Sequence, residues 1–278
     1  EFQENEITEY HIYSNLARRT RVSENRDLLQ RIAEDEKRHY GEWRAQTGQD
    51  VAPNRFKIWW YTLLGSTVGL TFALKLMEQG EEGAQEAYAE LIAVMPVAEQ
   101  ILADEDAHEA TLLGMLDEEM LRYTGSIILG LSDALVELTG ALAGLTLALQ
   151  DKTLIALTAS ITGIAASMSM AASEYLSTKT EESMKTPGRA ALYTGIAYVF
   201  TVMALILPYL LFDNLFVCLG LALLVAVLII AAFNYYVSVA EDVPFRRRFA
   251  EMAGLSLSIA ALSFGAGYLI RELFGVDV

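Results

Sequence analysis

The sequence predicts an all-α protein in two parts: a helical bundle over residues 1–122 and five membrane-spanning helices over residues 123–278. Three observations lead to this prediction. The first part holds 24 of the 36 acidic residues and 12 of the 20 lysines and arginines. The second part consists mainly of apolar runs long enough to cross a bilayer. In the first part, only Pro53 and Pro96 interrupt the helical texture, and a Glu-x-x-His motif occurs twice.

Five apolar segments, each of about 20 residues or more, supply the helix length that about 30 Å of hydrocarbon requires. Six basic residues lie in two alternate loops between these segments, against two on the other side. By the positive-inside rule, this asymmetry places the N-terminal part in the cytoplasm and the C-terminus on the outer side. The segments are roughly 125–149, 153–175, 190–212, 215–239 and 250–272, and the six basic residues are Lys179, Lys185, Arg189, Arg246, Arg247 and Arg248.

A shorter apolar run of 17 residues, 58–74, is close to the length of a membrane span. A span here would place the two Glu-x-x-His motifs on opposite sides of the membrane. We therefore expect a helix that is buried in the bundle or at a dimer interface and that continues into Glu81.

Composition excludes several classes of function. The net charge of −16 argues against nucleic acid as a partner. It fits a domain that handles cations, and it fits a solvated acidic surface equally well. The single cysteine, Cys218, excludes an intrachain disulfide and a cysteine-based metal cluster.

The soluble part repeats one pattern of metal-binding residue types. Each Glu-x-x-His motif follows a Glu and a Tyr seven positions apart, and i and i+3 share one side of a helix. One Glu from each of two helices, with a Glu-x-x-His from each of two others, is the ligand set of a dinuclear metal site in a helical bundle. The predicted ligands are Glu6, Glu36, His39, Glu81, Glu105 and His108, supported through hydrogen bonds by Tyr13 and Tyr88. Glu9, Glu78 and Glu82 remain alternatives to Glu6 and Glu81, and His11 is interpreted as helix surface.

Over most of its first 120 residues, the chain resembles the erythrin or rubrerythrin-like branch of the ferritin-like superfamily. This resemblance implies a four-helix bundle that binds two iron ions, with manganese as the second candidate metal. The sequence has no Cys-x-x-Cys, so the rubredoxin centre of rubrerythrins and its electron path are not carried over.

Two carboxylates, Asp133 and Glu137, lie one turn apart in the first span, and Met170 and Glu174 have the same spacing in the second. Ionisable residues in hydrocarbon are costly and usually mark an ion pathway. Carboxylate oxygen with thioether sulfur suits a borderline metal such as Fe²⁺. The alternatives are that Met168 and Met170 serve packing and that Glu174 lies at the membrane interface.

The segments GLSDALVELTGALAGL and SMSMAASEYLSTKT resemble the first two spans of the vacuolar iron transporter family. By position, Asp133, Met170 and Glu174 match residues of the family pattern, whereas Glu137 stands where a hydroxyl residue is common. Ala134 and Ser173 also depart from the pattern, each replacing a glycine. The resemblance implies a five-span homodimer that exchanges Fe²⁺, and sometimes Mn²⁺, for protons. The metal-binding extension of the family is shortened here to a loop that keeps Glu181, Glu182 and Met184.

As a whole, the chain resembles the membrane-bound ferritins, in which an erythrin domain is fused to a vacuolar-iron-transporter-like domain. The resemblance implies a proton-coupled exporter of Fe²⁺ or Mn²⁺ whose soluble domain binds, senses or oxidises iron. The alternative is a membrane-anchored diiron oxidase or peroxidase whose spans serve mainly as an anchor. The expected partners are Fe²⁺, H⁺, membrane lipid and a second copy of the chain.

Overall fold

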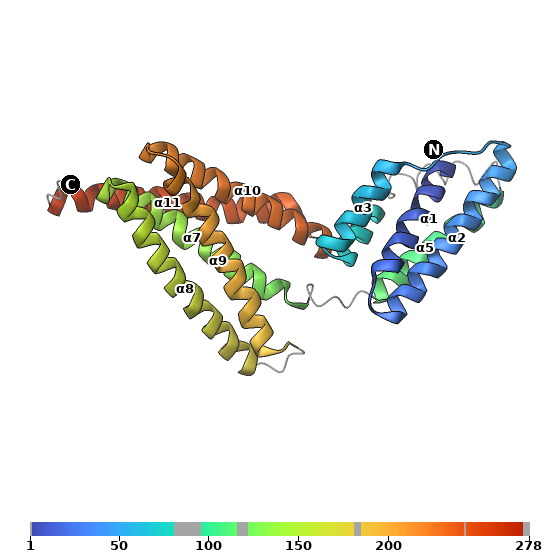
Figure 1. Cartoon of the computed structure of the whole chain (residues 1–278), viewed down its shortest axis with the longest axis horizontal. Helices are drawn as coiled ribbons and strands as arrows, with labels where there is room; N and C mark the ends of the chain where they lie inside the picture. The colour runs from blue at the N-terminus through green and yellow to red at the C-terminus, as the bar shows by residue number, and fades with distance from the viewer. Residues whose placement is uncertain (1, 81–95, 116–121, 181–184, 242, 275–278) are drawn as a thin grey trace. The chain divides into compact units, whose positions relative to one another are not determined.

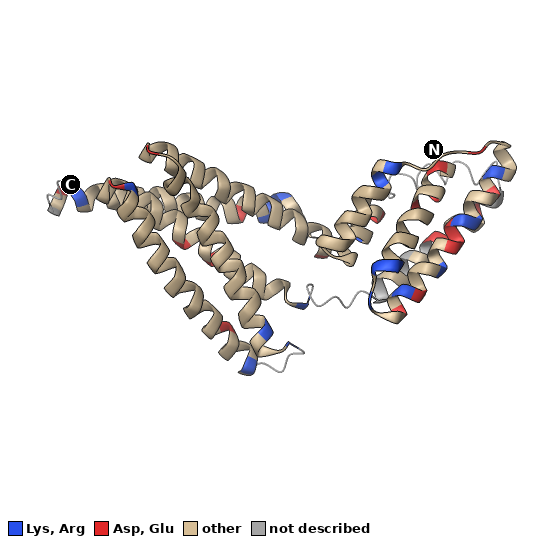
Figure 2. Ribbon diagram, viewed as in Figure 1, with Lys and Arg blue, Asp and Glu red and all other residues tan. Residues whose placement is uncertain are grey.

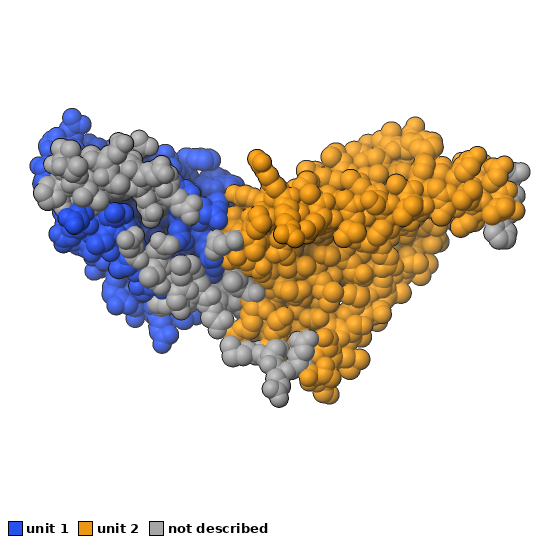
Figure 3. Space-filling view, turned by 180° about the vertical axis from the view of Figure 1, so that it is seen from behind, with its two compact units in different colours: residues 1–118 blue, residues 119–278 orange. Residues whose placement is uncertain are grey.

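The computed structural model describes residues 2–80, 96–115, 122–180, 185–241 and 243–274. All regular elements in these ranges are helices, so the prediction of an all-α protein is confirmed. The chain forms two compact units, Glu1–Glu118 and Glu119–Val278, which Figure 3 shows in different colours.

Unit 1 contains α1 (Phe2–Arg19), α2 (Ser23–Thr47), α3 (Arg55–Thr67), a helix over 70–80 and α5 (Pro96–Met115). Helix α1 packs along α2, α3 packs against α1, and α5 contacts α2 (Figure 1). Helix α2 ends where Gly48 adopts a left-handed φ of 66° and its N–H donates to the carbonyl of Arg44. The core of unit 1 is an apolar cluster that includes Ile12, Leu16, Leu29, Ile32, Leu74 and Met77.

The apolar run at 58–74 is not one continuous helix, so this expectation was wrong. Helix α3 ends at Thr67, and the next helix follows Gly69, whose φ of 140° is open to glycine alone among common residues. Residues 70–74 are buried as expected, but several large side chains of α3 are exposed. With 13 residues, α3 is about 20 Å long and too short to cross a bilayer.

Unit 2 contains α7 (Thr124–Leu149), α8 (Lys152–Thr180), α9 (Pro187–Leu211), α10 (Leu215–Glu241) and α11 (Phe245–Phe274). All five helices are long and apolar enough to cross a membrane. The protein is therefore an integral membrane protein. Figure 2 shows few charged residues along these helices, whereas α1 and α2 carry many.

Short polar turns separate the spans. The Asp151 carboxylate accepts a hydrogen bond of 2.8 Å from the backbone N–H of Leu154 at the start of α8. At the start of α10, the Asn214 side chain accepts one of 3.1 Å from the backbone N–H of Val217. Both contacts satisfy backbone donors that a helix leaves unpaired in its first turn.

Helix α7 is central to unit 2, because it packs against α8, α9, α10 and α11. Its approach to α11 depends on glycine: a Cβ on Gly267 would collide with the carbonyl of Gly144. A Cβ on Gly130 would likewise collide with the Thr194 carbonyl on α9. Small residues allow such close packing where lipid supplies no hydrophobic drive for helix association.

Candidate functional site

Helices α1, α2 and α5 bring acidic residues and histidines together in the interior of unit 1. One ligand atom from each of Glu6, Glu36, His39 and Glu105 lies within 4.8 Å of the others. Glu6, Glu36 and His39 are at most 2% exposed, so this is not a surface cluster. His108 joins the group through its Nδ1 atom, which lies 3.4 Å from Oε1 of Glu36.

The Nδ1 atoms of both histidines point into the carboxylates. His39 Nδ1 lies 3.2 Å from Glu105 Oε1, 3.5 Å from Glu6 Oε2 and 3.7 Å from Glu36 Oε2. His108 Nδ1 lies 3.9 Å from Glu105 Oε2 as well as close to Glu36. Each Glu-x-x-His motif therefore contributes its imidazole to a space that it shares with the glutamate of the other motif.

The outer ring nitrogens of the histidines contact two aspartates in a crossed arrangement. His39 Nε2 lies 3.2 Å from Asp104 Oδ2, and His108 Nε2 lies 3.1 Å from Asp35 Oδ2. Each aspartate immediately precedes the glutamate of one motif and contacts the histidine of the other. Sequence reasoning missed both aspartates, although the repeated pattern Asp-Glu-x-x-His was visible. An acceptor at Nε2 fixes the tautomer that leaves Nδ1 available to a metal.

Arg38 connects the two aspartates on the outer side of the cluster. Its guanidinium lies 2.8 Å from Asp35 Oδ1 and 3.0 Å from Asp104 Oδ2. Burial alone would raise the pKa of each aspartate, but Arg38 and the histidines hold both below the usual range. Both side chains are therefore carboxylates at neutral pH and accept from the imidazoles.

The donors fit a divalent metal. Both carboxylate oxygens of Glu36 and the Nδ1 atoms of His39 and His108 are buried, and they make no hydrogen bond with any described residue. Buried polar atoms are normally paired by hydrogen bonds, so these four atoms form a group that could hold a metal ion. Carboxylate oxygen and imidazole nitrogen are the donors that iron and manganese take in helical bundles.

Burial and proximity shift the proton affinities of these groups. Burial, with nearby Glu36, raises the pKa of Glu6 to about 8, although His39 opposes the shift. Burial would lower the pKa of His39, but the carboxylates of Glu105, Glu36 and Glu6 raise it to about 12. The same competition raises the pKa of His108 to about 10. A metal that binds at the Nδ1 atoms must therefore displace protons.

One further contact to the group comes from Trp43, and of the other predicted residues of unit 1 some are described by the structure and some are not. Trp43 Nε1 donates a 3.2 Å hydrogen bond to Glu6 Oε1, and sequence reasoning missed this contact. Tyr13, predicted to support a ligand, is buried in the apolar cluster. Of the two glutamates weighed on α1, Glu6 joins the group, whereas Glu9 lines a small cavity beside Met77. The other predicted residues, Glu81 and Tyr88, and the alternative Glu82 lie outside the described residues.

In unit 2, Asp133 and Glu137 lie on α7, and a tyrosine of α9 contacts the second of them. Tyr198 is fully buried and donates a 2.5 Å hydrogen bond from its hydroxyl to Glu137 Oε2. Asp133 is half-buried and Glu137 is exposed. Sequence reasoning missed Tyr198, because its pairing joins two spans 61 residues apart.

Glu174 lies near one end of the spans. It is buried, and its Oε1 accepts a 2.6 Å hydrogen bond from Ser126 at the start of α7. Ser126 precedes Asp133 by seven residues, a rise of about 10 Å along the helix. Met170 packs against the apolar core of the unit. Within one chain, Glu174 therefore does not lie at the level of Asp133 and Glu137. The loop residues Glu181, Glu182 and Met184 lie outside the described residues.

The fold and these clusters define an integral membrane protein with a candidate metal site in unit 1. Residues 124–186 match the family described as the VIT family, a family of metal transporters. The matched segment runs from the start of α7 to the turn before α9 and includes Asp133, Glu137, Met170 and Glu174. No curated protein and no solved structure matches the chain.

Proposed function

We propose that the protein is a proton-coupled transporter that exports Fe²⁺, with Mn²⁺ as a second cargo, from the cytoplasm. The observation that carries the proposal is the VIT-family match over the two spans that contain Asp133, Glu137 and Glu174. Carboxylates in a span both attract a divalent cation and exchange protons, so one set of groups serves both ions. The basic loops before α9 and α11 support a cytoplasmic position of unit 1.

Asp133 is proposed as the metal-binding and proton-exchanging group of the pathway. Glu137 provides a second carboxylate one turn further along α7. Because Glu137 is exposed and Asp133 half-buried in one protomer, a second copy facing α7 would enclose the pathway. This is why we propose a homodimer as the transporting form. Met170 and Glu174 would contribute at other levels of the pathway.

Unit 1 is proposed to bind two metal ions, in the manner of ferritin-like proteins. Glu6, Glu36, His39, Glu105 and His108 would hold the metal, with Glu81 completing the set. Bound iron of this kind supplies redox chemistry. Asp104 and Asp35 orient the imidazoles of His39 and His108. Glu6, Glu36 and His39 are buried away from bulk water. Unit 1 would thereby capture, sense or oxidise iron.

The alternative function is a membrane-anchored diiron oxidase or peroxidase. The enclosed Glu and His group of unit 1 favours this reading, because it forms within one chain without any contribution from the spans. In that case the five helices of unit 2 would mainly serve as an anchor, and metal would not cross the membrane.

Reconstitution of the full chain in liposomes separates the two functions. Under anaerobic conditions, a fluorescent chelator trapped inside the vesicles reports Fe²⁺ entry while a pH gradient is imposed and then collapsed with an ionophore. The transporter proposal predicts Fe²⁺ flux that depends on the gradient. If Fe²⁺ is oxidised by the protein in air but never crosses the membrane, the alternative is correct and the transporter proposal fails.

A further inference from the structure

Helix α3 of unit 1 presents a continuous aromatic face to its surroundings. Phe56, Trp59, Trp60 and Leu63 are 69%, 57%, 40% and 36% exposed. Their spacing of three, four and seven residues places them on one side of the helix. The three rings also contact one another, with centroids 6.0 to 6.5 Å apart. Soluble surfaces rarely expose such a contiguous apolar patch unless it has a partner.

The orientation of this face is fixed by the opposite side of α3. Thr62 and Leu64 are buried, and Ile58 and Tyr61 pack against the apolar core of unit 1. Gly65 meets the side chain of Leu16 so closely that a Cβ would collide with it. Rotation of α3 would expose this packed side, so the aromatic face cannot turn inward.

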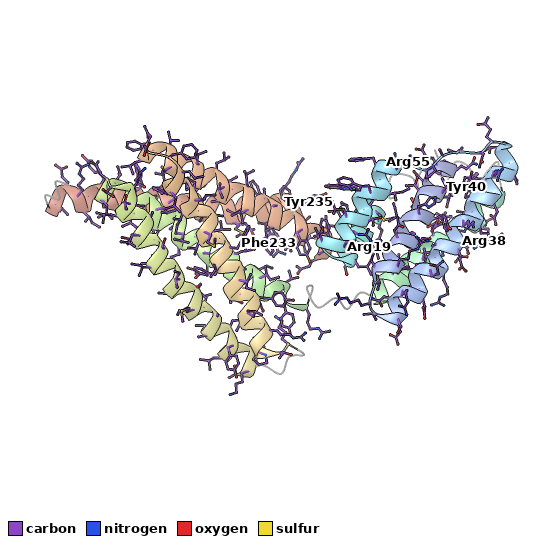
Figure 4. All side chains as sticks on the ribbon, viewed as in Figure 1. Arg19, Arg38, Tyr40, Arg55, Phe233 and Tyr235 are labelled. Carbon is purple, nitrogen blue, oxygen red and sulfur yellow. The ribbon has the colours of Figure 1, made fainter. Side chains whose placement is uncertain are left out.

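Both ends of α3 are also tethered. At the beginning, Asn54 caps the helix and its own backbone N–H donates a 2.9 Å hydrogen bond to Thr8 of α1. At the end, Arg19 of α1 donates a 2.8 Å hydrogen bond to Ser66. Figure 4 labels Arg55 and Arg19 near the two ends of α3. The aromatic face is therefore a rigid feature of the unit that carries Glu6.

The charges of α3 differ from those of the unit around it. Its sequence RFKIWWYTLLGST contains two basic residues and no acidic one, although residues 1–122 carry 24 acidic and 12 basic residues. Tryptophan and phenylalanine next to Arg and Lys are typical of helices that lie at the membrane–water interface. In such helices, the aromatic rings enter the headgroup region and the basic side chains reach lipid phosphates.

The first membrane span follows unit 1 after only a short stretch of chain. Helix α5 ends at Met115 and the first span begins at Thr124, so the connection extends at most about 30 Å. Such a short tether gives the contact a high effective concentration, and a small patch is then sufficient for association.

The size of the patch also favours lipid over a second protein chain. From these exposures and ordinary side-chain areas, the four residues offer roughly 400–500 Å². A stable protein interface takes about 800 Å² from each partner.

We propose that α3 is an interfacial anchor, whose aromatic face inserts into the bilayer that the five spans cross. Phe56, Trp59 and Trp60 lie at headgroup depth, and Arg55 and Lys57 contact lipid phosphates. Since α3 packs on α1, the anchor holds the metal-binding group of unit 1 at the membrane surface. This proposal depends on the membrane spans and not on the transported ion.

Tryptophan fluorescence tests this directly, because the chain has three tryptophans and none lies in a span. The full chain is reconstituted in vesicles whose lipids carry bromine near the carbonyl end or near the methyl end of one acyl chain. We expect the shallow bromines to quench most of the Trp59 and Trp60 emission, and the deep bromines to quench less. The variant Trp59→Phe/Trp60→Phe keeps only the buried Trp43 as reference and is expected to lose this quenching.

A charge-reversal pair sharpens the test while keeping all tryptophans. Arg55→Glu/Lys57→Glu is expected to reduce quenching in vesicles with anionic lipid, whereas Arg26→Glu/Arg31→Glu on exposed positions of α2 leaves it unchanged. Equal quenching of the wild type and the Trp59→Phe/Trp60→Phe variant would overturn the proposal. So would shielding of Trp59 and Trp60 from aqueous iodide without any quenching by brominated lipid, which would identify a second protein chain as the partner.

Discussion

The two clusters of carboxylate side chains, one in each unit, differ in how completely the surrounding residues of the chain enclose them. In unit 1, Glu6, Glu36 and His39 are buried, and both imidazoles are backed by an aspartate. In unit 2, Asp133 is half-buried, Glu137 is exposed, and Tyr198 is the neighbouring side chain that holds Glu137. An enclosed, fully oriented donor set suits a metal that stays, whereas an ion in transit must bind weakly enough to leave.

The largest expected effect separates the two groups by function. Asp133→Asn removes the charge that we propose to attract the cation and accept the proton, so gradient-driven Fe²⁺ flux should fall to the level of protein-free liposomes. At saturating Fe²⁺, His39→Ala should keep the flux of the wild type, because its side chain belongs to unit 1. Glu272→Gln, an exposed carboxylate at the end of α11, is the matched control. Normal flux in Asp133→Asn would mean that the spans do not use this residue.

The second prediction concerns the buried glutamates and histidines of unit 1. Glu36 lies between both histidines, so Glu36→Gln should lower the affinity of unit 1 for Fe²⁺ or Mn²⁺ by more than about 100-fold, beyond the effect usual for groups that only support a ligand. Anaerobic calorimetric titration of the full chain in detergent measures this affinity, in the Asp133→Asn background so that the spans contribute little. Glu34→Gln, exposed on the same helix, should bind as the parent does. Unchanged binding in Glu36→Gln would place the metal elsewhere.

The third prediction addresses the crossed aspartates. Asp35→Asn and Asp104→Asn each keep the shape of the side chain but weaken the acceptor at one Nε2 atom. Each should reduce metal affinity by about 10- to 100-fold, as loss of a group that supports a ligand does. The same titration measures the change, and Asp27→Asn on an exposed position of α2 serves as control. If both variants bind like the parent, the aspartates only stabilise unit 1 through Arg38.

Local patterns in the sequence predicted the fold class and much of the candidate site. Apolar runs of membrane length are continuous along the chain, so five spans could be read directly. The Glu-x-x-His spacing likewise acts within one helix turn. The contacts that were missed join distant segments: Asp104 with His39, Trp43 with Glu6, and Tyr198 with Glu137. The repeated Asp-Glu-x-x-His pattern marks the aspartates, but local periodicity does not show which distant residue each side chain contacts.

The expectation of one continuous helix over residues 58–74 was wrong for a different reason. Its residues are apolar or small and none is charged, so hydropathy could not locate the break at Gly69 or show which residues point outward. Burial of 70–74 is decided by packing between helices, and exposure of Trp59 and Trp60 follows from which side of α3 faces α1. The apolar pattern therefore did not distinguish a helix buried in the core from one with an exposed apolar face.

The smallest expected effect tests whether the Tyr198 hydroxyl changes the function of Glu137 in unit 2. Tyr198→Phe removes the hydroxyl that donates to Glu137 and leaves the packing of the ring in place. A hydrogen bond to a charged group contributes about 1.5 kcal/mol or more, so Fe²⁺ flux should change by about tenfold. In the Glu137→Gln background, the same substitution should have a much smaller effect, because the pair acts as one unit. Tyr268→Phe, on an exposed position of α11, controls for the loss of a phenol in the membrane. Equal effects of Tyr198→Phe in the wild type and in the Glu137→Gln background would show that Tyr198 acts on helix packing. Asp133 and Glu137 of α7 would then be two independent carboxylates.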